Sequence, residues 1–159
     1  IGLSLLRHVR HSYRPNTSVL AIDGAGRHGP IPAVAGAQTQ PGLIVYEFGA
    51  DLFYANADRF AEDVRNLVAH APAPTRWFVV DAGAVTDIDY SAAQTLRDLI
   101  ADLQQQGIAL ALARVRTGLR GDLARHGVIA ALGQDRIFGT MHEALAAANT
   151  ALAQQSRKT

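Results

Sequence analysis

Apolar and polar positions follow a regular order from residue 43 onward, and this pattern predicts strands that alternate with helices. Residues 43–48 predict a strand, and the continuous apolar centres of the runs at residues 76–81 and 108–113 indicate further strands, of the kind buried on both faces in a parallel sheet. After each strand, apolar residues recur every three or four positions, which is the spacing of a helix that packs on a sheet. The predicted helices cover residues 56–71, 91–106, 119–125 and 140–152.

The part of the chain before residue 43 predicts a short strand at residues 18–22, which a loop joins to the next strand, so the two should pair antiparallel. Residues 23–32 are rich in glycine and proline and predict this loop. Their glycines match the GxGxxG spacing of a dinucleotide site, but Pro30 and Pro32 oppose the helix that such a site requires. The expected fold is a single α/β domain, with a mixed, mostly parallel sheet of four to five strands and flanking helices.

Composition narrows the classes of function. A chain of 159 residues with 48% apolar residues suits one domain with a sizeable core. The absence of cysteine excludes disulfides, thiolate metal sites and thiol catalysis. The formal net charge is only +1, but the charge is unevenly distributed. The first stretch holds five basic residues and no acid: Arg7, His8, Arg10, His11 and Arg14.

This basic stretch follows an apolar end, which is the order found where a transmembrane helix leaves the membrane on its cytoplasmic side. A basic arm on a trimmed chain explains the same residues equally well. Anionic lipid headgroups are the expected partner of the stretch, whereas nucleic acid is not, because no aromatic platform interleaves with the charges. The predicted division is a membrane-proximal basic linker at residues 1–15, a folded domain at residues 16–150 and a flexible C-terminal tail at residues 151–159.

The loops that follow the parallel strands form the expected functional edge, because ligands of such sheets bind beyond the carboxyl ends of the strands. These loops are residues 49–56, 82–91 and 114–118. The second loop gathers two carboxylates, Asp87 and Asp89, directly before a helix. Aspartates are common in turns and caps, so this pair gives only weak support for catalytic acids or metal ligands.

Ser91 opens the helix that follows this loop, and its spacing to Gln94 is that of a capping box. The hydroxyl is therefore expected to cap the helix, at an end where unpaired amides and the helix dipole favour an anion or a phosphate. A nucleophilic serine is not supported, because no glycine-flanked elbow surrounds it. We expect no catalytic residue, no metal site and no required cofactor, so the chain is not predicted to be an enzyme.

Four blocks of sequence, in order, resemble the STAS domain of SulP-type anion transporters. They are LIVYEF at residues 43–48, LFYANA at residues 52–57, FVVDA at residues 78–82 with VTDIDYSA at residues 85–92, and DRIF at residues 135–138. The stretch RHSYRP at residues 10–15 is similar to the segment that joins the last membrane helix of these transporters to the domain. The resemblance implies the fold shared by STAS domains and anti-sigma-factor antagonists, over residues 16–150.

The resemblance further implies a regulatory domain on the cytoplasmic face of the cell membrane, within a multi-pass transporter of sulfate or another anion. Its partner would be the transmembrane domain of the same protein, and a regulatory protein or a second copy of the domain are further candidates. The family has also been proposed to bind nucleotides, here GTP, GDP or ATP, without a Walker-type motif, and none is present in this chain. The residues expected to receive a nucleotide or a partner surface are Phe53, Asn56, Thr86, Asp87, Asp89, Ser91, Arg114, Thr117 and Gly118.

A second interpretation stays open. STAS domains also occur as free-standing bacterial anti-sigma-factor antagonists, in which a kinase partner phosphorylates a serine at the start of the second helix. Ser91 falls at that position, although Tyr90 and Ala92 stand where the antagonists tend to have a small residue and glycine. The alternative to a transporter domain is therefore a soluble switch phosphorylated at Ser91.

Overall fold

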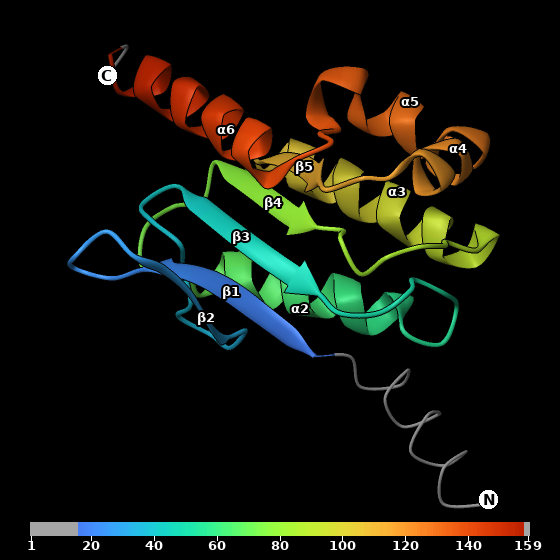
Figure 1. Ribbon diagram of the computed structural model, residues 1–159, viewed down its shortest axis with the longest axis horizontal. Coiled ribbons are helices and arrows are strands. Elements are labelled where there is room, and N and C mark those ends of the chain that lie inside the picture. Colours follow the sequence, from blue (N-terminus) through green and yellow to red (C-terminus); the bar gives the residue numbers. More distant parts are fainter. Residues whose placement is uncertain (1–15, 158–159) are drawn as a thin grey trace, which may run out of the picture.

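The computed structural model describes residues 16–157, which form one five-stranded sheet with helices packed on both faces (Figure 1). The strands are β1 (Thr17–Ile22), β2 (His28–Pro32), β3 (Leu43–Phe48), β4 (Trp77–Asp81) and β5 (Ala109–Ala113). The helices are α2 (Ala57–Ala69), α3 (Tyr90–Gln105), α4 (Thr117–Arg125), α5 (Val128–Leu132), the 3-10 turn η1 (Gln134–Arg136) and α6 (Met141–Ser156). Strands and helices alternate from β3 onward, which confirms the predicted α/β class.

The strands lie in the order β2-β1-β3-β4-β5. β3, β4 and β5 are parallel, whereas β1 is antiparallel to both β2 and β3. The predicted mixed sheet and the antiparallel pairing of β1 with β3 are thereby confirmed. Asp81, the last residue of β4, pairs in register with Glu47 of β3 and Ala113 of β5, so the three parallel strands end at one edge of the sheet.

The prediction that residues 23–32 form only a loop is wrong, because β2 occupies their second half. β2 pairs with β1 over five registered positions. Its two prolines are tolerated because β2 lies at the edge of the sheet, where a missing N–H costs no ladder hydrogen bond. Asp23 fixes the turn between the strands, since its carboxylate accepts from the backbone N–H groups of Ala25 and Arg27, each at 2.9 Å.

The main core lies between the sheet and the helices α2 and α3, with α4 and α5 beside α3 (Figure 1). The buried residues of α2 are Ala57, Phe60, Ala61, Val64 and Leu67, and those of α3 are Ala92, Ala93, Leu96, Leu99, Ile100 and Leu103. The Phe60 ring centroid lies 5.9 Å from that of Tyr46 and 5.2 Å from that of Phe48. The Tyr46 hydroxyl donates to Asp63 at 3.2 Å, and burial raises the pKa of this phenol. The face of each helix predicted to be apolar is therefore the face that builds the core.

Among the described helices, α6 alone covers the opposite face of the sheet (Figure 1). Its residues Ala144 and Ala148 are buried against side chains of β3, β4 and β5. Thr140 and Glu143 form the predicted capping box, with both hydrogen bonds at 3.2 Å. The helix continues to Ser156, so the boundary expected after residue 150 falls inside it.

No helix within residues 16–157 combines the length and the apolar run that crossing a membrane requires. The predicted basic linker, residues 1–15, lies outside the described part of the chain. The linker and its expected contacts with anionic lipids therefore stay predictions.

Candidate functional site

The carboxyl edge of the sheet is formed by the ends of β3 and β4 and by the loops after β3, β4 and β5. The first two loops run side by side, because Leu52 and Ile88 form a parallel bridge. The N–H of Leu52 donates to the carbonyl of Asp87, and the N–H of Asp89 donates to the carbonyl of Leu52, each at 3.3 Å. The structure thus brings together two of the three predicted loops directly. The carboxyl edge is defined here as residues 47–56, 81–91 and 114–118.

Asp51 holds the first two loops together. One of its carboxylate oxygens accepts from the N–H of Thr86 at 2.6 Å, from the hydroxyl of Thr86 at 2.8 Å and from the N–H of Asp87 at 3.1 Å. Sequence reasoning missed this role of Asp51. The sequence does hint at this role, because Asp51 lies in the loop after β3 just as Asp87 and Asp89 lie in the loop after β4. Thr86 is therefore part of this edge through Asp51, while the carboxylate of Asp87 has no hydrogen bond within the described residues.

Asp89, and not Ser91, caps α3, so the predicted capping role of Ser91 is wrong. The helix begins at Tyr90, and Asp89 accepts from the N–H of Ala92 at 2.7 Å. Its second oxygen accepts from the N–H of Tyr54 at 2.9 Å. Asp and Ser cap helices equally well, but only a carboxylate has a second oxygen for the neighbouring loop. Ser91 is exposed in the first turn of α3, and its hydroxyl has no hydrogen bond within the described residues.

Asn56 stands at the predicted N-cap position of α2, but its side chain makes no capping hydrogen bond. Instead its oxygen accepts from the N–H of Phe53 at 3.0 Å, and its amide donates to the carbonyl of Asp51 at 2.9 Å. The side chain is 1% exposed and closes the loop between β3 and α2 from inside. Asn56 therefore fixes the backbone of Asp51 and Phe53 from inside the loop.

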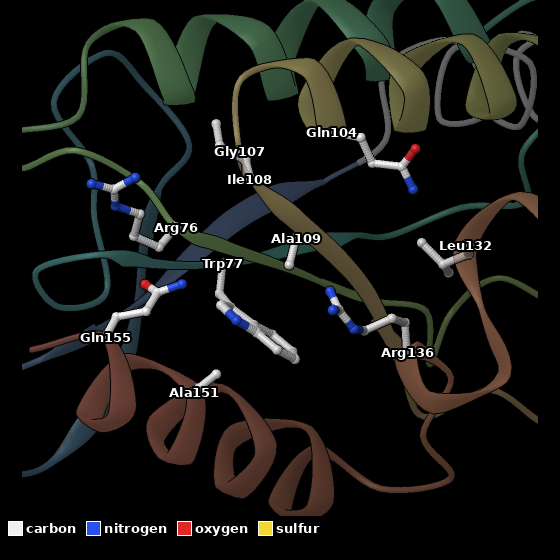
Figure 2. Close-up of a pocket in the computed structure, with 10 residues that line it drawn as sticks. All are labelled: Arg76, Trp77, Gln104, Gly107, Ile108, Ala109, Leu132, Arg136, Ala151 and Gln155. Atoms are coloured by element: carbon white, nitrogen blue, oxygen red, sulfur yellow. The ribbon is translucent and has the colours of Figure 1, made fainter. Parts of the chain in front are cut away.

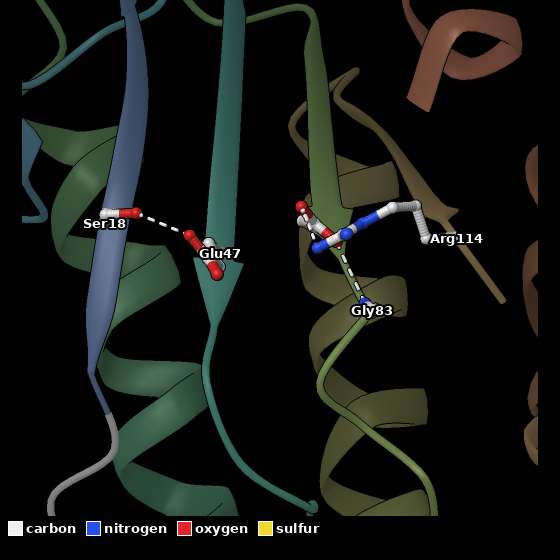
Figure 3. Close-up of polar contacts among 5 residues, drawn as sticks. Ser18, Glu47, Gly83 and Arg114 are labelled. Carbon is white, nitrogen blue, oxygen red and sulfur yellow. Dashed lines mark hydrogen bonds and ion pairs between the residues drawn. The ribbon is translucent and has the colours of Figure 1, made fainter. Parts of the chain in front are cut away.

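Arg114 links the third loop to β4 (Figure 3). Its guanidinium donates two hydrogen bonds to Asp81, at 2.7 and 2.9 Å, and these bonds raise its pKa above the ordinary range. The N–H of Gly83 donates to the same carboxylate at 2.9 Å. Glu47 of β3, which lies beside Asp81 in the sheet, accepts from the hydroxyl of Ser18 of β1 at 3.0 Å. Each of the two adjacent carboxylates is thus paired, which offsets their mutual repulsion.

The charge and the exposed rings of the carboxyl edge set what can bind there. The edge contains five carboxylates and two arginines. Tyr54 is 70% exposed and Tyr90 is 68% exposed, and they follow the two loops that Asp51 and Asp89 hold together. Phe53 is half-buried and its ring lies 6.0 Å from that of Tyr54. The edge therefore presents aromatic rings in acidic surroundings on hydrogen-bonded loops.

The remaining predicted site residues are less connected. Thr117 and Gly118 are exposed at the start of α4, and no hydrogen bond within the described residues joins them to the first two loops. No group of residues that could hold a metal ion occurs within residues 16–157. The first two predicted loops are thus joined through Asp51 and Asp89, the side chain of Ser91 takes no part in these hydrogen bonds, and Arg114 is attached through Asp81 of β4.

Comparisons with known proteins agree with this architecture. The family model described as the STAS domain matches residues 35–144. A Mycobacterium tuberculosis protein named as a probable sulfate transporter is 35% identical over 149 residues, which are 92% of this chain and 26% of that protein. Sulfate transporter 1.3 of Arabidopsis thaliana is 27% identical over 154 residues, which are 91% of this chain and 24% of that protein.

Solved structures show the same fold. A sulfate transporter family protein from Wolinella succinogenes is 28% identical, with a TM-score of 0.63 over 70% of this chain and 88% of that chain. The STAS domain of a SulP transporter from Vibrio cholerae is 20% identical and shares the fold with a TM-score of 0.61, over 72% of this chain and 87% of that chain. The predicted fold of STAS domains and anti-sigma-factor antagonists is confirmed.

The sheet, its helices and the loops at its carboxyl edge define an α/β domain of the STAS type. The chain belongs to the STAS domain family, and its relatives are SulP-type sulfate transporters. It spans about a quarter of the length of the curated relatives that it matches, 26% and 24% for the two named above.

Proposed function

We propose that this domain regulates a SulP-type anion transporter, with sulfate as the first candidate anion, by docking its carboxyl edge on the membrane part of the same protein. The names of the relatives support the class of transporter. The domain has no catalytic role in this proposal and lies on the cytoplasmic face of the membrane. A regulatory protein or a second copy of the domain is the alternative occupant of the same surface.

The position at which the chain enters the domain carries this proposal. Asn16, the first described residue, accepts from the N–H of Gly49 at 3.0 Å, and Thr17 pairs with Phe48 at the end of β3. The residues that resemble the transporter linker therefore lead into the domain at the carboxyl edge. This places the exposed rings of Tyr54 and Tyr90 on the side of the domain where the membrane part would be attached.

The charge of the carboxyl edge and the charge of cytoplasmic membrane-protein loops also support docking of the one on the other. Cytoplasmic loops of membrane proteins carry an excess of lysine and arginine, and five carboxylates against two arginines at the carboxyl edge complement that charge. Exposed tyrosines on a hydrogen-bonded frame are typical of residues that dominate protein interfaces. A cationic protein surface therefore fits this edge.

The test is anion uptake by the full-length transporter in vesicles. Tyr54→Ser with Tyr90→Ser should change sulfate uptake about fivefold or more, because a coupling of ~1 kcal/mol or more between domain and transporter has that effect. Val34→Ser, at another exposed apolar position, is the matched control and should leave uptake unchanged. Uptake that is equal in the double variant and in the control would contradict the docking role of the carboxyl edge.

Binding of GTP, GDP or ATP at these loops stays a prediction. The five carboxylates oppose a polyphosphate, and the guanidinium of Arg114 is already paired with Asp81. Titration of the domain with each nucleotide tests the prediction, with the backbone amide signals of residues 49–56, 82–91 and 114–118 as the readout. Shifts confined to other surfaces would remove the nucleotide from this site.

Phosphorylation of Ser91 is the second candidate function, and the exposure of its unpaired hydroxyl favours it. A phosphate in the first turn of α3 gains from the helix dipole and adds up to two negative charges to the docking surface. Ser91→Asp should then shift uptake in the opposite direction to Ser91→Ala. Mass spectrometry of the transporter from its native membrane detects the modification itself, and its absence under all growth conditions would end this candidate.

A further inference from the structure

A groove lies beside the carboxyl edge, on the face of the sheet that carries α6. This helix packs over β3, β4 and β5, and no helix within residues 16–157 lies over β1 and β2 on the same face (Figure 1). A hollow of about 200 Å³ opens there between the β1–β2 hairpin and the first residue of α6. We call it the hairpin groove. Residues that line it include Ser18, Leu20, Pro30, Val45, Glu47 and Met141.

The walls of the hairpin groove are apolar. Val45 is buried in the sheet, and Leu20 and Met141 are partly buried against the same cluster of side chains. Pro30 pairs with Leu20 from the edge strand β2 and lines the outer side of the groove. The hollow is smaller than the roughly 300–1,000 Å³ of sites for free small molecules. Its size therefore suits one long side chain of a docked protein.

One carboxylate of this groove is not neutralised by a cation. Glu47 is exposed, and one of its oxygens accepts from the hydroxyl of Ser18, which carries no charge. Figure 3 shows the side chain of Glu47 between Ser18 on one side and the guanidinium of Arg114 on the other. That guanidinium donates both of its hydrogen bonds to Asp81, which pairs in register with Glu47. Two carboxylates opposite each other thus share one cation, and the second oxygen of Glu47 has no hydrogen bond within the described residues.

We propose that the hairpin groove receives the side chain of a lysine from the protein surface that docks on the carboxyl edge. The methylene chain of the lysine would lie along Leu20, Val45 and Met141. Its ammonium group would donate to the carboxylate of Glu47 and to the hydroxyl oxygen of Ser18. The identity of the partner rests on the proposed function, in which this surface belongs to the membrane part of the same protein.

Charge and geometry favour lysine over other side chains at this position. A compact ammonium group with rotatable donors fits two acceptors that stand on neighbouring strands, whereas the planar fork of arginine matches a single carboxylate. Arg114 already binds Asp81 in the second way. An apolar side chain would fill the groove but would remove water from Glu47 without supplying a hydrogen bond, which costs free energy. The five carboxylates and two arginines of the adjoining carboxyl edge attract a cationic surface to the same side of the domain.

Met141 is the single methionine of the chain, so its methyl group is a unique NMR reporter for the groove. Nα-acetyl-lysine methylamide, titrated into the 159-residue chain with an isotope-labelled methionine methyl group, should saturably shift this signal and the amide signals of Leu20 and Glu47. Nα-acetyl-norleucine methylamide carries only the apolar stem, and methylammonium carries only the charge. Each should bind about fivefold more weakly, because it lacks one of the two groups that the groove recognises. Equal affinity for either control, or shifts confined to other surfaces, would overturn the proposal.

The variant Glu47→Gln shows whether the carboxylate carries the binding. Glutamine can still accept from Ser18, and it removes the charge opposite Asp81, so the fold should tolerate the change. The lysine probe should bind this variant about fivefold more weakly, which is the effect of losing one exposed ion pair. Glu62→Gln is the matched control, because it removes an exposed carboxylate of α2 on the other face of the sheet, and it should bind the probe like the parent chain. Unchanged affinity in Glu47→Gln would overturn the proposal.

Sulfate uptake by the full-length transporter separates this proposal from docking itself. Glu47→Gln should change uptake in the same direction as Tyr54→Ser with Tyr90→Ser, whereas Glu62→Gln should leave it unchanged. A change in the tyrosine double variant with none in Glu47→Gln would keep docking at the carboxyl edge and overturn the role of the groove in it. Unchanged uptake in both, with the lysine probe still bound by the domain, would overturn the membrane part as the source of the lysine.

Discussion

The two ends of the sheet differ in charge and in the pairing of their polar groups. At the carboxyl edge, five carboxylates face two arginines, and Asp51, Asp81 and Asp89 are all committed to hydrogen bonds. At the opposite end of the sheet, where β4 and β5 begin, a hollow is lined by residues that include Arg76 and Arg136, and no carboxylate is among them (Figure 2). The rule that ligands bind beyond the carboxyl ends of parallel strands names a place, but charge decides what that place accepts. The carboxylates of the carboxyl edge therefore favour a cationic partner, whereas the lining of the opposite hollow does not.

Among the substitutions at the carboxyl edge, replacing Asp89 should cause the largest loss of stability. Asp89→Ala removes both the cap of α3 and the acceptor for the N–H of Tyr54, so we expect the free energy of unfolding to fall by about 2 kcal/mol. Asp87→Ala removes the same charge from a side chain without a hydrogen bond within the described residues, and it should cost less than about 0.5 kcal/mol. Urea denaturation measures both. Equal losses would mean that net charge, and not hydrogen bonding, sets the stability of the carboxyl edge.

Gly83→Ala should have the next largest effect. A Cβ atom at Gly83 would overlap the guanidinium of Arg114, which must then leave Asp81. We expect a loss of about 1 kcal/mol, because a partly exposed bidentate pair is broken beside the carboxylate of Glu47. In the background of Arg114→Gln the same change should cost almost nothing, which a double-mutant cycle measures.

The control for this prediction is Gly118→Ala, where a Cβ atom meets no other atom within 4 Å. Gly118 lies in α4, and alanine favours a helix over glycine by roughly 0.5–1 kcal/mol. This variant should therefore be at least as stable as the parent chain. A cost at Gly83 that persists without Arg114 would point to the backbone instead of the ion pair.

The regular elements of the fold could be predicted because each one has its own local pattern. The apolar runs of β3, β4 and β5 and the helical spacing in α2 and α3 depend on residues close in sequence. β2 could not be predicted in this way, because its two prolines and its glycine are typical of a loop. Only its position beside β1 at the sheet edge makes them compatible with a strand.

The site residues show where local patterns stop being sufficient. Asp89 and Ser91 are both good caps two residues apart, and the choice between them depends on the N–H of Tyr54, which is 35 positions away from Asp89. The hollow where β4 and β5 begin has no local signal, because its lining residues come from β4, the turn into β5, η1 and α6, which meet only in the folded chain. Taken alone, Arg136 is typical of a solvated charge.

The smallest predicted effect concerns the start of β4, where the single tryptophan of the chain, Trp77, lies under the guanidinium of Arg136 and serves as the reporter. Arg136→Gln removes the cation over the Trp77 ring, so the fluorescence intensity of Trp77 should change while the free energy of unfolding falls by only about 0.5–1 kcal/mol. Asp89→Ala lies at the other end of the sheet and should leave the fluorescence of the folded state unchanged, although it costs more stability. A fluorescence change in Asp89→Ala, or none in Arg136→Gln, would contradict the separation of the two edges, because the two sites would then be coupled or the stacking would be absent in solution.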